Sequence, residues 1–434
     1  MSGSPSLFSL HTFLSLYLPA TLLSLGNSMV APVIPVFARS FEVSFTSASL
    51  VFVAAQLGHL AVTFPAGVLM DKIGRRPVLL AGPVLTAVGS FATPFSPSFE
   101  WMVVCRFIVG AGAQLWQESR MVVIADTVGH RQRARQIQWM MGVSRAGHLF
   151  GPALGGLLAA GIGIWIPFVL HGILTLLAII PSFKLIGESA PERRGRGEPS
   201  HESLPSSEAK GAAGAEDPGW RGIIALFFTF QIVIFLGAQL FAQFARGGHE
   251  HGSLNLYAVY KFDLGPDMLG LMATAAVIFG IPVPFITGWA MDKYGRKSVI
   301  VPGFASYGVT ALLMSLTAFL ELPFAVFIVL YVMVQATMGT TGGTMQVLGT
   351  DLSPALGRGR FFAIWRTISA VGGTVSPAVF AIISDQAGFG AGFVFLGLCA
   401  LSVAVLVGFV LGDTAKYAEA REREQDRQRT ATPA

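Results

Sequence analysis

Long runs of apolar residues alternate along this chain with short polar segments. Each run is about 20 residues long, which is the length that an α-helix needs to cross about 30 Å of hydrocarbon. The pattern predicts an all-α membrane protein with twelve transmembrane helices. The predicted spans are 12–36, 46–69, 77–97, 100–124, 137–160, 163–185, 222–245, 268–290, 298–318, 323–348, 361–384 and 390–412.

The composition agrees with this pattern. Of the 434 residues, 53% are hydrophobic and 12% are charged, whereas soluble proteins contain about 25% charged residues. The two cysteines, Cys105 and Cys399, lie inside predicted spans. They give neither a disulfide framework nor a metal site.

The basic residues predict the orientation in the membrane. Most of the 29 Lys and Arg fall in loops on one side of the predicted spans. Loops with such an excess face the cytoplasm. We therefore expect a multi-pass protein of the cell membrane, in contact with the lipid bilayer and with both termini in the cytoplasm. The net charge of +5 follows from this placement, so we do not expect nucleic-acid binding.

A ten-residue stretch at 67–76, in the loop between the second and third spans, returns in altered form at 288–297. Each copy contains an aspartate, a glycine suited to the positive φ of a sharp turn, and a basic pair suited to anionic lipid. A repeat separated by half the chain indicates a duplicated chain with two related halves. The repeated residues are Gly67, Asp71, Gly74, Arg75 and Arg76 in the first copy, and Gly288, Asp292, Gly295, Arg296 and Lys297 in the second.

The predicted halves are residues 1–185 and 222–412. Between them, residues 186–221 are rich in Pro, Gly, Ser, Glu and Arg, a composition that cannot bury a core. We expect this segment to be a flexible cytoplasmic linker. Residues 413–434 form a charged segment that we expect to be a cytoplasmic tail.

Two further patterns lie within spans. The fourth span begins with Arg-x-x-x-Gly-x-Gly at Arg106. The fifth contains Gly-x-x-x-Gly-Pro-x-x-Gly-Gly, formed by Gly147, Gly151, Pro152, Gly155 and Gly156. Small residues at this spacing let another helix approach closely, and the proline interrupts the backbone hydrogen-bond ladder.

The duplicated loop and these two patterns resemble signature motifs of the major facilitator superfamily, and the resemblance covers nearly the whole chain. The pattern of the fifth span resembles one that the family associates with antiporters, in particular the twelve-helix drug:proton antiporters. The resemblance implies two six-helix halves that rock about a site near the middle of the membrane. It also implies a proton gradient as the energy source and no cofactor.

The fourth span predicts a polar face. At about 100° per residue, Arg106, Gln117 and Arg120 share one face, which should turn toward a water-filled centre because arginines avoid lipid. Glu118 is the carboxylate that the sequence places well inside a span. It fits either reversible protonation, with Arg106 acting on the substrate, or a fixed ion pair with Arg120 or Arg145.

Other polar residues allow more than one interpretation. His59 is either a proton relay or a hydrogen-bonded interior residue. His249-Glu250-His251, in a predicted outer loop at 246–267, is a weak metal-binding pattern, and we expect no metal. Further candidates for coupling or substrate contact are Asn27, Arg145 and Arg366, and candidates for ion pairs of a gate are Asp126, Arg133, Asp351 and Arg358.

The sequence contains no nucleophile–base set, phosphate-binding loop or metal cluster, so we expect neither an enzyme nor an ATP-driven pump. We expect a secondary transporter that acts as a monomer, and the resemblance favours proton-coupled efflux of a small organic solute or drug. Arginines outnumber carboxylates in the predicted spans, which favours an alternative substrate, an organic anion. A third interpretation is a non-transporting receptor with the same fold.

Overall fold

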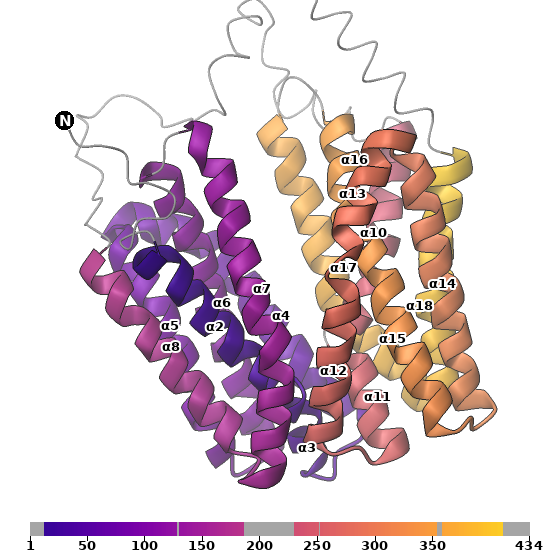
Figure 1. The fold of residues 1–434 in the computed structure, drawn as a ribbon, viewed down its shortest axis with the longest axis horizontal. Helices are drawn as coiled ribbons and strands as arrows, with labels where there is room; N and C mark the ends of the chain where they lie inside the picture. The colour runs from indigo at the N-terminus through magenta and orange to yellow at the C-terminus, as the bar shows by residue number, and fades with distance from the viewer. Residues whose placement is uncertain (1–12, 128–129, 186–229, 251, 354–357, 411–434) are drawn as a thin grey trace, which may run out of the picture.

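The structure, a computed structural model, describes residues 13–127, 130–185, 230–250, 252–353 and 358–410 (Figure 1). The first half of the described chain contains η1 (Phe13–Tyr17), α2 (Leu18–Val30), α3 (Val33–Arg39), α4 (Phe45–Ile73), α5 (Arg75–Ala92), η2 (Thr93–Phe95), α6 (Phe99–Thr127), α7 (His130–Gly161) and α8 (Ile166–Leu185). The second half contains α10 (Phe230–Glu250), α11 (Ser253–Phe262), α12 (Pro266–Gly280), α13 (Val283–Tyr294), α14 (Lys297–Phe319), α15 (Phe324–Thr340), α16 (Thr344–Leu352), α17 (Arg358–Ala387), α18 (Phe389–Val405) and η4 (Leu406–Val410).

Twelve passes through the membrane account for these helices. In the described chain, nine segments are long and apolar enough to span a bilayer, and α8 contributes a shorter apolar helix, Ile166–Pro181. Helices α6 and α7 are 29 and 32 residues long, which is enough to span although they are more polar. The predicted all-α fold with twelve transmembrane helices is confirmed.

Four passes consist of two helices with a break between them: α2–α3, α10–α11, α12–α13 and α15–α16. Pro32 and Pro282 directly precede α3 and α13, where a proline cannot donate to the helix ladder. Gly252 and Gly343 have φ of +91° and +75° at the other two breaks. Broken passes free main-chain polar groups, which the membrane tolerates where protein or a cavity surrounds them.

The break at Gly252 corrects one prediction. The sequence predicts an outer loop at 246–267, and this is wrong, because α10 continues to Glu250 and α11 occupies Ser253–Phe262. The helix tolerates charges here because Arg246 and Glu250 form an ion pair at i, i+4 spacing. Glu250 is therefore a carboxylate inside a span, in addition to Glu118.

The two halves repeat one scheme of helix packing (Figure 1). In the first half, α2 packs on α7 and α8, α5 packs on α6 and α8, and α4 packs on α6. The second half contains the corresponding pairs: α10 with α17 and α18, α14 with α15 and α18, and α12 with α15. The fold consists of two pseudo-symmetric six-helix bundles. The predicted linker at 186–221 and the predicted tail at 413–434 lie outside the described residues.

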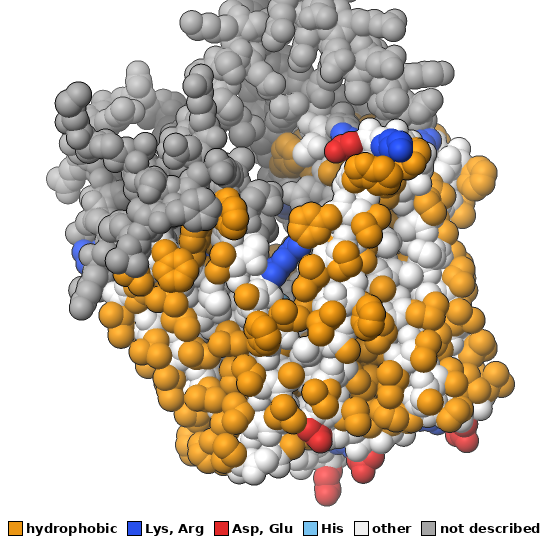
Figure 2. Space-filling model, viewed as in Figure 1, with side chains coloured by type: hydrophobic (Ala, Val, Ile, Leu, Met, Phe, Trp, Pro, Cys, Tyr) orange, Lys and Arg blue, Asp and Glu red, His pale blue; other side chains and the backbone are white. Residues whose placement is uncertain are grey.

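The halves contact each other along two seams, α7 on α12 and α4 on α17. They meet at the end of the molecule where α3 and α11 lie, and they diverge toward the other end (Figure 1). We call the end where the halves meet the closed end. We call the opposite end the loop end, because α4 and α13 end there at the repeated glycines Gly74 and Gly295. Figure 2 shows a basic side chain in the groove between the apolar outer surfaces of the two halves.

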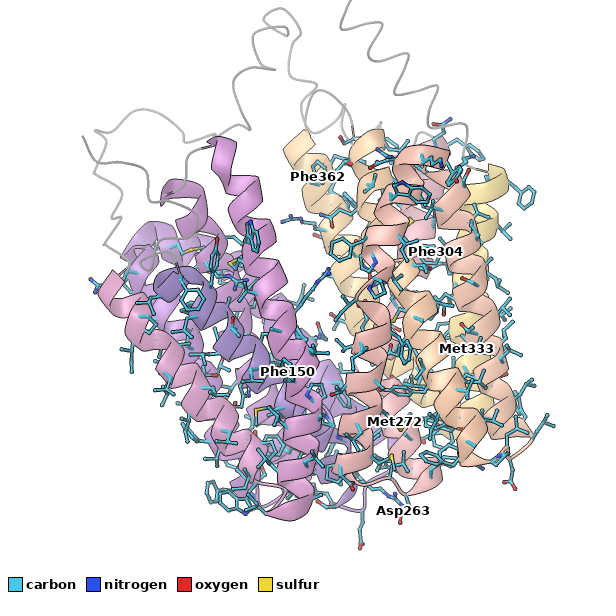
Figure 3. All side chains as sticks on the ribbon, in the orientation of Figure 1. Phe150, Asp263, Met272, Phe304, Met333 and Phe362 are labelled. Carbon is cyan, nitrogen blue, oxygen red and sulfur yellow. The ribbon has the colours of Figure 1, made fainter. Side chains whose placement is uncertain are left out.

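Polar contacts between the halves stabilise the closed end. Arg39, at the end of α3, donates a hydrogen bond of 2.7 Å to the carboxylate of Asp263, which directly follows α11 and is labelled in Figure 3. Asp385 on α17 accepts a hydrogen bond of 3.0 Å from the backbone N–H of Thr46 in the first turn of α4. A carboxylate at this position satisfies a free N–H group and complements the positive end of the helix.

The repeated loop has the backbone geometry that its glycines predict. Gly74 and Gly295 directly follow α4 and α13 with φ of +93° and +87°, values that favour glycine over other residues. In the second copy, Arg296 donates to the Asp292 carboxylate at 3.3 Å. The side chains of Asp71 and Arg75 in the first copy lie outside the described part of the structure.

Candidate functional site

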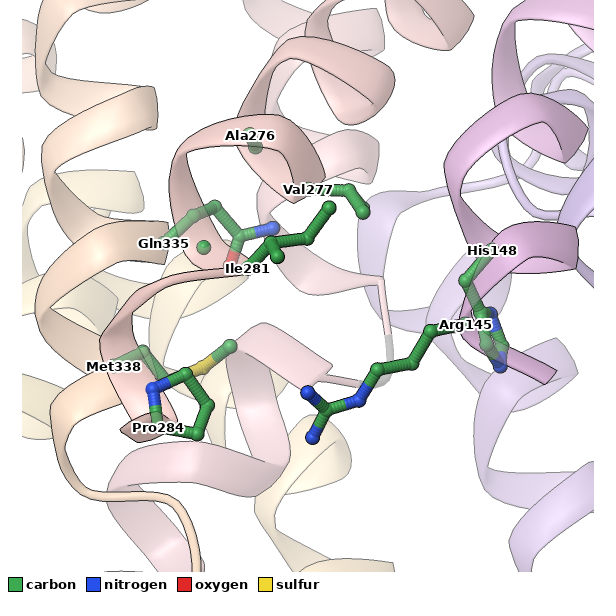
Figure 4. A pocket seen from close by; sticks show the side chains of 9 residues that line it. Arg145, His148, Ala276, Val277, Ile281, Pro284, Gln335 and Met338 are labelled. Atoms are coloured by element: carbon green, nitrogen blue, oxygen red, sulfur yellow. The ribbon is translucent and has the colours of Figure 1, made fainter. Parts of the chain in front are cut away.

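A cavity of about 280 Å³ lies in the groove between the two halves (Figure 4). Arg145 and His148 on α7 form one wall, and the Arg145 side chain extends toward Pro284 on the opposite side. The opposite wall belongs to the second half and is mostly apolar, with Gln335 as a polar side chain. Arg145, a predicted candidate, therefore lies where a solute would contact both halves.

A second cavity, of about 220 Å³, lies within the first half between α2, α5, α6, α7 and α8. His148 lines both this cavity and the groove cavity. In this second cavity, Arg120 donates to the side-chain oxygen of Gln117 at 2.6 Å. His171 also lines it, and its Nδ1 lies 2.9 Å from the hydroxyl of Ser90. The predicted candidates that line it are Asn27, Gln117 and Arg120. None of its described lining residues is acidic, so its polar groups can donate hydrogen bonds to an anion.

The third cavity is the largest of the three, about 460 Å³, and lies in the second half between α10, α15, α16 and α17. Its wall is polar, because Gln239, Gln243 and Gln346 line it together with charged side chains. Arg366, a predicted candidate, lines this cavity from α17. The ion-paired residues Arg246 and Glu250 also line it. The sequence suggests Glu250 only as part of a weak metal-binding pattern and gives no role to Arg246. Their i, i+4 spacing is the signal that could have identified them.

Arg106 and Glu118 are not among the residues that line the three cavities just described. Arg106 is 7% exposed, and its Nε atom has no hydrogen-bond partner among the described residues. The Glu118 carboxylate accepts a hydrogen bond of 2.8 Å from Gln114, whose amide also lies 3.1 Å from the Thr63 hydroxyl on α4. In the described structure Glu118 thus interacts with an amide, and the ion pair with Arg120 or Arg145 is not present.

The glycines of the α7 pattern contact two different helices. Gly147, Gly151 and Gly155 lie against α2 of the same half, where an added Cβ would overlap Ser24 and Leu25, Ser28, or the Met29 backbone. Gly156 instead faces Pro266 and Asp267 at the start of α12, in the other half. The pattern therefore packs α7 within its half and also forms part of the seam between the halves.

Pro152 belongs to the same seam. An added Cβ on Gly270 of α12 would overlap the carbonyl oxygen of Pro152. One residue further along α7, the backbone N–H of Ala153 donates a hydrogen bond of 3.0 Å to the Thr274 hydroxyl of α12. The two halves thus meet here backbone to backbone, with one hydroxyl satisfying a main-chain donor next to the proline.

The proposed roles of several residues selected from the sequence stay predictions. The side chains of Asp126, Arg133, Asp351 and Arg358 lie outside the described part of the structure, so the proposed gate pairs are not placed. Gly67 and Gly288 have open space where a Cβ would be added. His59 is partly buried in α4 and does not line the three cavities described above.

The described residues contain no group of three or more His, Cys, Asp and Glu that could hold a metal ion. In the weak pattern at 249–251, His249 is buried and its Nδ1 lies 2.6 Å from the Tyr307 hydroxyl. Glu250 turns to Arg246 instead. His251 lies outside the described residues.

Comparison with known proteins finds two drug-resistance proteins by sequence and a sugar–proton symporter by structure. The chain is 29% identical over 171 residues to the quinolone resistance protein NorA of Staphylococcus aureus, a match that covers 39% of this chain and 44% of NorA. It is 29% identical over 290 residues to the class C tetracycline resistance protein of Escherichia coli, covering 66% of this chain and 69% of that protein. Among solved structures, a D-xylose–proton symporter matches with a TM-score of 0.71 at 16% identity, over 93% of this chain and 98% of the other.

A family model fits nearly the whole chain. The model of the Major Facilitator Superfamily matches residues 16–260 and 252–434. The fold has the two six-helix halves and the two seams described above, and the D-xylose–proton symporter shares this fold. On these findings the chain belongs to the Major Facilitator Superfamily.

Proposed function

We propose that this protein is a secondary active transporter that exports a small organic solute in exchange for protons. The protein acts as a monomer in the cell membrane, with both termini in the cytoplasm. The two halves rock about their seams, so that the cavities between and within them open to one side of the membrane at a time. The proton gradient favours one of the two states and so drives the cycle.

The observation that supports this proposal best is the contrast between the two ends of the molecule. Contacts such as Arg39–Asp263 join the halves at the closed end, whereas the halves diverge toward the loop end (Figure 1). The polar cavities lie between these ends. This is the geometry of one state of an alternating-access cycle, open toward the side that the charge pattern predicts to be cytoplasmic. The drug-resistance names of two relatives support export over uptake.

An organic anion is the substrate class that a second observation favours. Arg120, His148 and His171 line the first-half cavity, Arg145 stands next to it in the groove, and no described residue of that cavity is acidic. Arginine binds carboxylates and other planar anions through paired hydrogen bonds. A lipophilic cation would find no counter-charge there, although Glu250 could supply one in the second-half cavity.

Flux in proteoliposomes tests both proposals. The purified protein is reconstituted, a pH gradient is imposed in either direction, and two probes are offered: the cation ethidium and the anion naphthalene-1-sulfonate. Antiport predicts accumulation of one probe inside vesicles with an acidic interior, because protons leave as the probe enters. A protonophore should abolish the accumulation. Empty liposomes serve as the control.

The two probes also separate the substrate classes. Accumulation of the sulfonate alone would establish the anion, and accumulation of ethidium alone would reject it. Accumulation only when the exterior is acidic would show symport, which contradicts export by exchange. A protein that binds a probe without moving it under any gradient would be a receptor, and the transporter proposal would fail.

A further inference from the structure

We propose that Glu250, paired with Arg246 where two membrane passes are broken, is the group whose protonation couples transport to the proton gradient. The proposal rests on the proton-driven transport proposed above and names its coupling site. It differs from the sequence-based expectation, in which Glu118 has this role. The support comes from the position of the pair, from its partners and from its access to water.

The pair lies where both the seventh and the tenth pass are broken. Glu250 is the last residue of α10, and α11 begins three residues later at Ser253. In the tenth pass, α15 ends at Thr340 and α16 begins at Thr344. Broken passes are where transporters of several folds bind ions near the middle of the membrane, because main-chain groups become available there.

Arg246 connects the two breaks. One guanidinium nitrogen, Nη2, donates to Glu250 Oε1, and the other, Nη1, donates to the hydroxyl of Thr341 and, at 3.2 Å, to the carbonyl of Met338. Met338 lies in the last turn of α15 and Thr341 directly follows this helix. The carbonyls at this end give the helix a partial negative charge. Arg246 therefore satisfies a helix end with one nitrogen and a carboxylate with the other.

These contacts allow the ion pair to open without isolating the arginine. When Glu250 takes up a proton, its charge is lost and the attraction to Arg246 falls, but Arg246 keeps Thr341 and Met338 as partners. A buried arginine with no partner at all would be very costly in a membrane. The pair can thus exist in two arrangements. In one, Glu250 is ionised and bound to Arg246; in the other, a proton occupies the Glu250 carboxyl oxygen and Arg246 is bound only to Thr341 and Met338.

A second hydrogen bond between the seventh and tenth passes would let protonation of Glu250 move one helix against another. The Tyr331 hydroxyl of α15 donates a hydrogen bond of 2.9 Å to Asn255 of α11. Helix α15 is therefore bound to the seventh pass on both sides of its break, to α10 through Arg246 and to α11 through Asn255. Loosening only the Arg246 tie would let α10 move against α15 while α11 stays in place.

Water can reach Glu250. Its side chain is 34% exposed and lines the 460 Å³ cavity, whereas the side chain of Arg246 is 20% exposed. The neighbouring His249 is 4% exposed and faces away, toward the Tyr307 hydroxyl of α14 and the Phe393 ring of α18. A proton entering from the cavity therefore meets the Glu250 carboxylate and not the imidazole of His249.

The charged and titratable groups around Glu250, within the described structure, come from four helices. On α10 they are Arg246 and His249; Arg366 lines the same cavity from α17; Tyr307 of α14 and Cys399 of α18 lie behind His249. Among these groups Glu250 is the one that carries a negative charge near neutral pH. Arg246 is the group in direct contact with that charge.

Glu118 has neither a broken pass nor a charged partner in the described structure. It accepts a hydrogen bond from the neutral amide of Gln114 on the same helix, and α6 is unbroken from Phe99 to Thr127. Protonation of Glu118 would change its bond to Gln114, whose amide also contacts Thr63 of α4; both of these helices are unbroken. Protonation of Glu250 changes a bond that joins two broken passes.

The test compares uphill accumulation with exchange in proteoliposomes, using whichever of ethidium and naphthalene-1-sulfonate the wild-type protein accumulates. Exchange of labelled for unlabelled probe needs no proton gradient, whereas accumulation does. We expect Glu250→Gln to lower accumulation by about tenfold or more while exchange persists, because the proton no longer distinguishes the two states. The dependence of exchange on pH should flatten in this variant. Glu100→Gln, which neutralises an exposed carboxylate in the first turn of α6, is the matched control and should behave as wild type.

The double variant Arg246→Gln/Glu250→Gln guards against misfolding, because it leaves no unpaired arginine in the membrane. If Glu250 only neutralises Arg246, removing both charges restores accumulation, and the proposal is overturned. If Glu250 carries the coupling proton, the double variant exchanges probe but does not accumulate it.

Two further outcomes separate the proposals. Loss of accumulation in Glu118→Gln, with wild-type accumulation in Glu250→Gln, would assign the coupling to Glu118 and reject Glu250. A wild-type protein that neither accumulates nor exchanges either probe would overturn the proposed function itself, and the coupling site with it.

Discussion

A single methyl group on the seam between the halves should shift the protein away from the state described here. Gly156 of α7 lies at the closed end of this seam, against the first turn of α12. In Gly156→Ala, the new Cβ would overlap the carbonyl oxygen of Pro266 and lie 3.0 Å from its carbon and 3.2 Å from the Cα of Asp267. These neighbours are backbone atoms of a helix and cannot move aside by changing a rotamer.

The size of the effect follows from this overlap. The seam must widen by roughly 1 Å at the closed end, and overpacking of this kind costs about 1–3 kcal/mol. The cost applies to the state in which the closed end is shut and is relieved when that end opens. The ratio of closed to open molecules should therefore fall by about 5- to 150-fold. Gly270→Ala, which meets the Pro152 carbonyl from the other side, should act in the same direction.

Spin labels measure this ratio. Labels attached at Glu42→Cys and Glu321→Cys place one probe on each half at the closed end, both at exposed positions. Pulsed electron resonance on the protein in lipid nanodiscs then gives the populations of short and long distances. The native Cys105 and Cys399 are buried, but both should be replaced by serine to prevent unwanted labelling.

Gly142→Ala is the control, because it adds the same methyl group to the same helix where nothing lies within 4 Å of the new atom. It should leave the distance distribution unchanged. If Gly156→Ala and Gly142→Ala give the same distribution as the wild-type protein, the closed-end seam does not restrain the cycle, and the reasoning from backbone contact is refuted.

Three more predictions concern other parts of the molecule. Asp263→Asn should lower the closed population by no more than about fivefold, because the Asp263 carboxylate is 88% exposed and exposed pairs contribute about 1 kcal/mol or less; Arg39→Ala should lower it further, because Arg39 also donates to the Val259 carbonyl of α11, and equal effects of the two variants in the same spin-label experiment would mean that this second hydrogen bond is irrelevant. Gly151→Leu should insert into the membrane but lose probe transport, because the added side chain would collide with Ser28 and wedge α7 from α2; unchanged transport would reduce the glycine pattern to coincidence. Cysteines at Ile73 and Tyr294, exposed near the two repeated glycines, should react with an impermeant maleimide only from the cytoplasmic side, and labelling from outside would reverse the predicted topology.

Sequence periodicity predicted the architecture well because the relevant signals are local. The repeated glycine loop identified two halves, and Gly74 and Gly295 have the positive φ that a sharp turn requires. Helical periodicity also grouped Gln117 with Arg120, and both line the first-half cavity. Periodicity alone could not show that Arg106, on the same predicted face, is buried and does not line the cavity, although Val109, less than one helical turn away, does.

The sequence did not predict the Arg246–Glu250 pair of the second half, for a physical reason. A hydropathy pattern assigns a cost to each charge separately, so Arg246 and Glu250 suggested the end of a span. In the folded protein each side chain is the other's partner, and the carbonyl end of α15, distant in sequence, supplies the rest. The break between α15 and α16 is equally hard to predict, since residues 340–344 contain glycine and threonine that also suit close helix packing.

The two seams between the halves have an evolutionary consequence. Helix α7 is the fifth pass of the first half, and α17 occupies the same place in the second; α4 and α12 correspond in the same way. The seam of α7 on α12 and the seam of α17 on α4 are therefore the same contact made twice, as in the isologous interface of a two-fold symmetric dimer. A single ancestral six-helix chain could have assembled with a second copy through this surface before the gene was duplicated and fused. Fusion would then have freed the copies to differ, so that one half now holds a basic cavity and the other holds the paired acid and base.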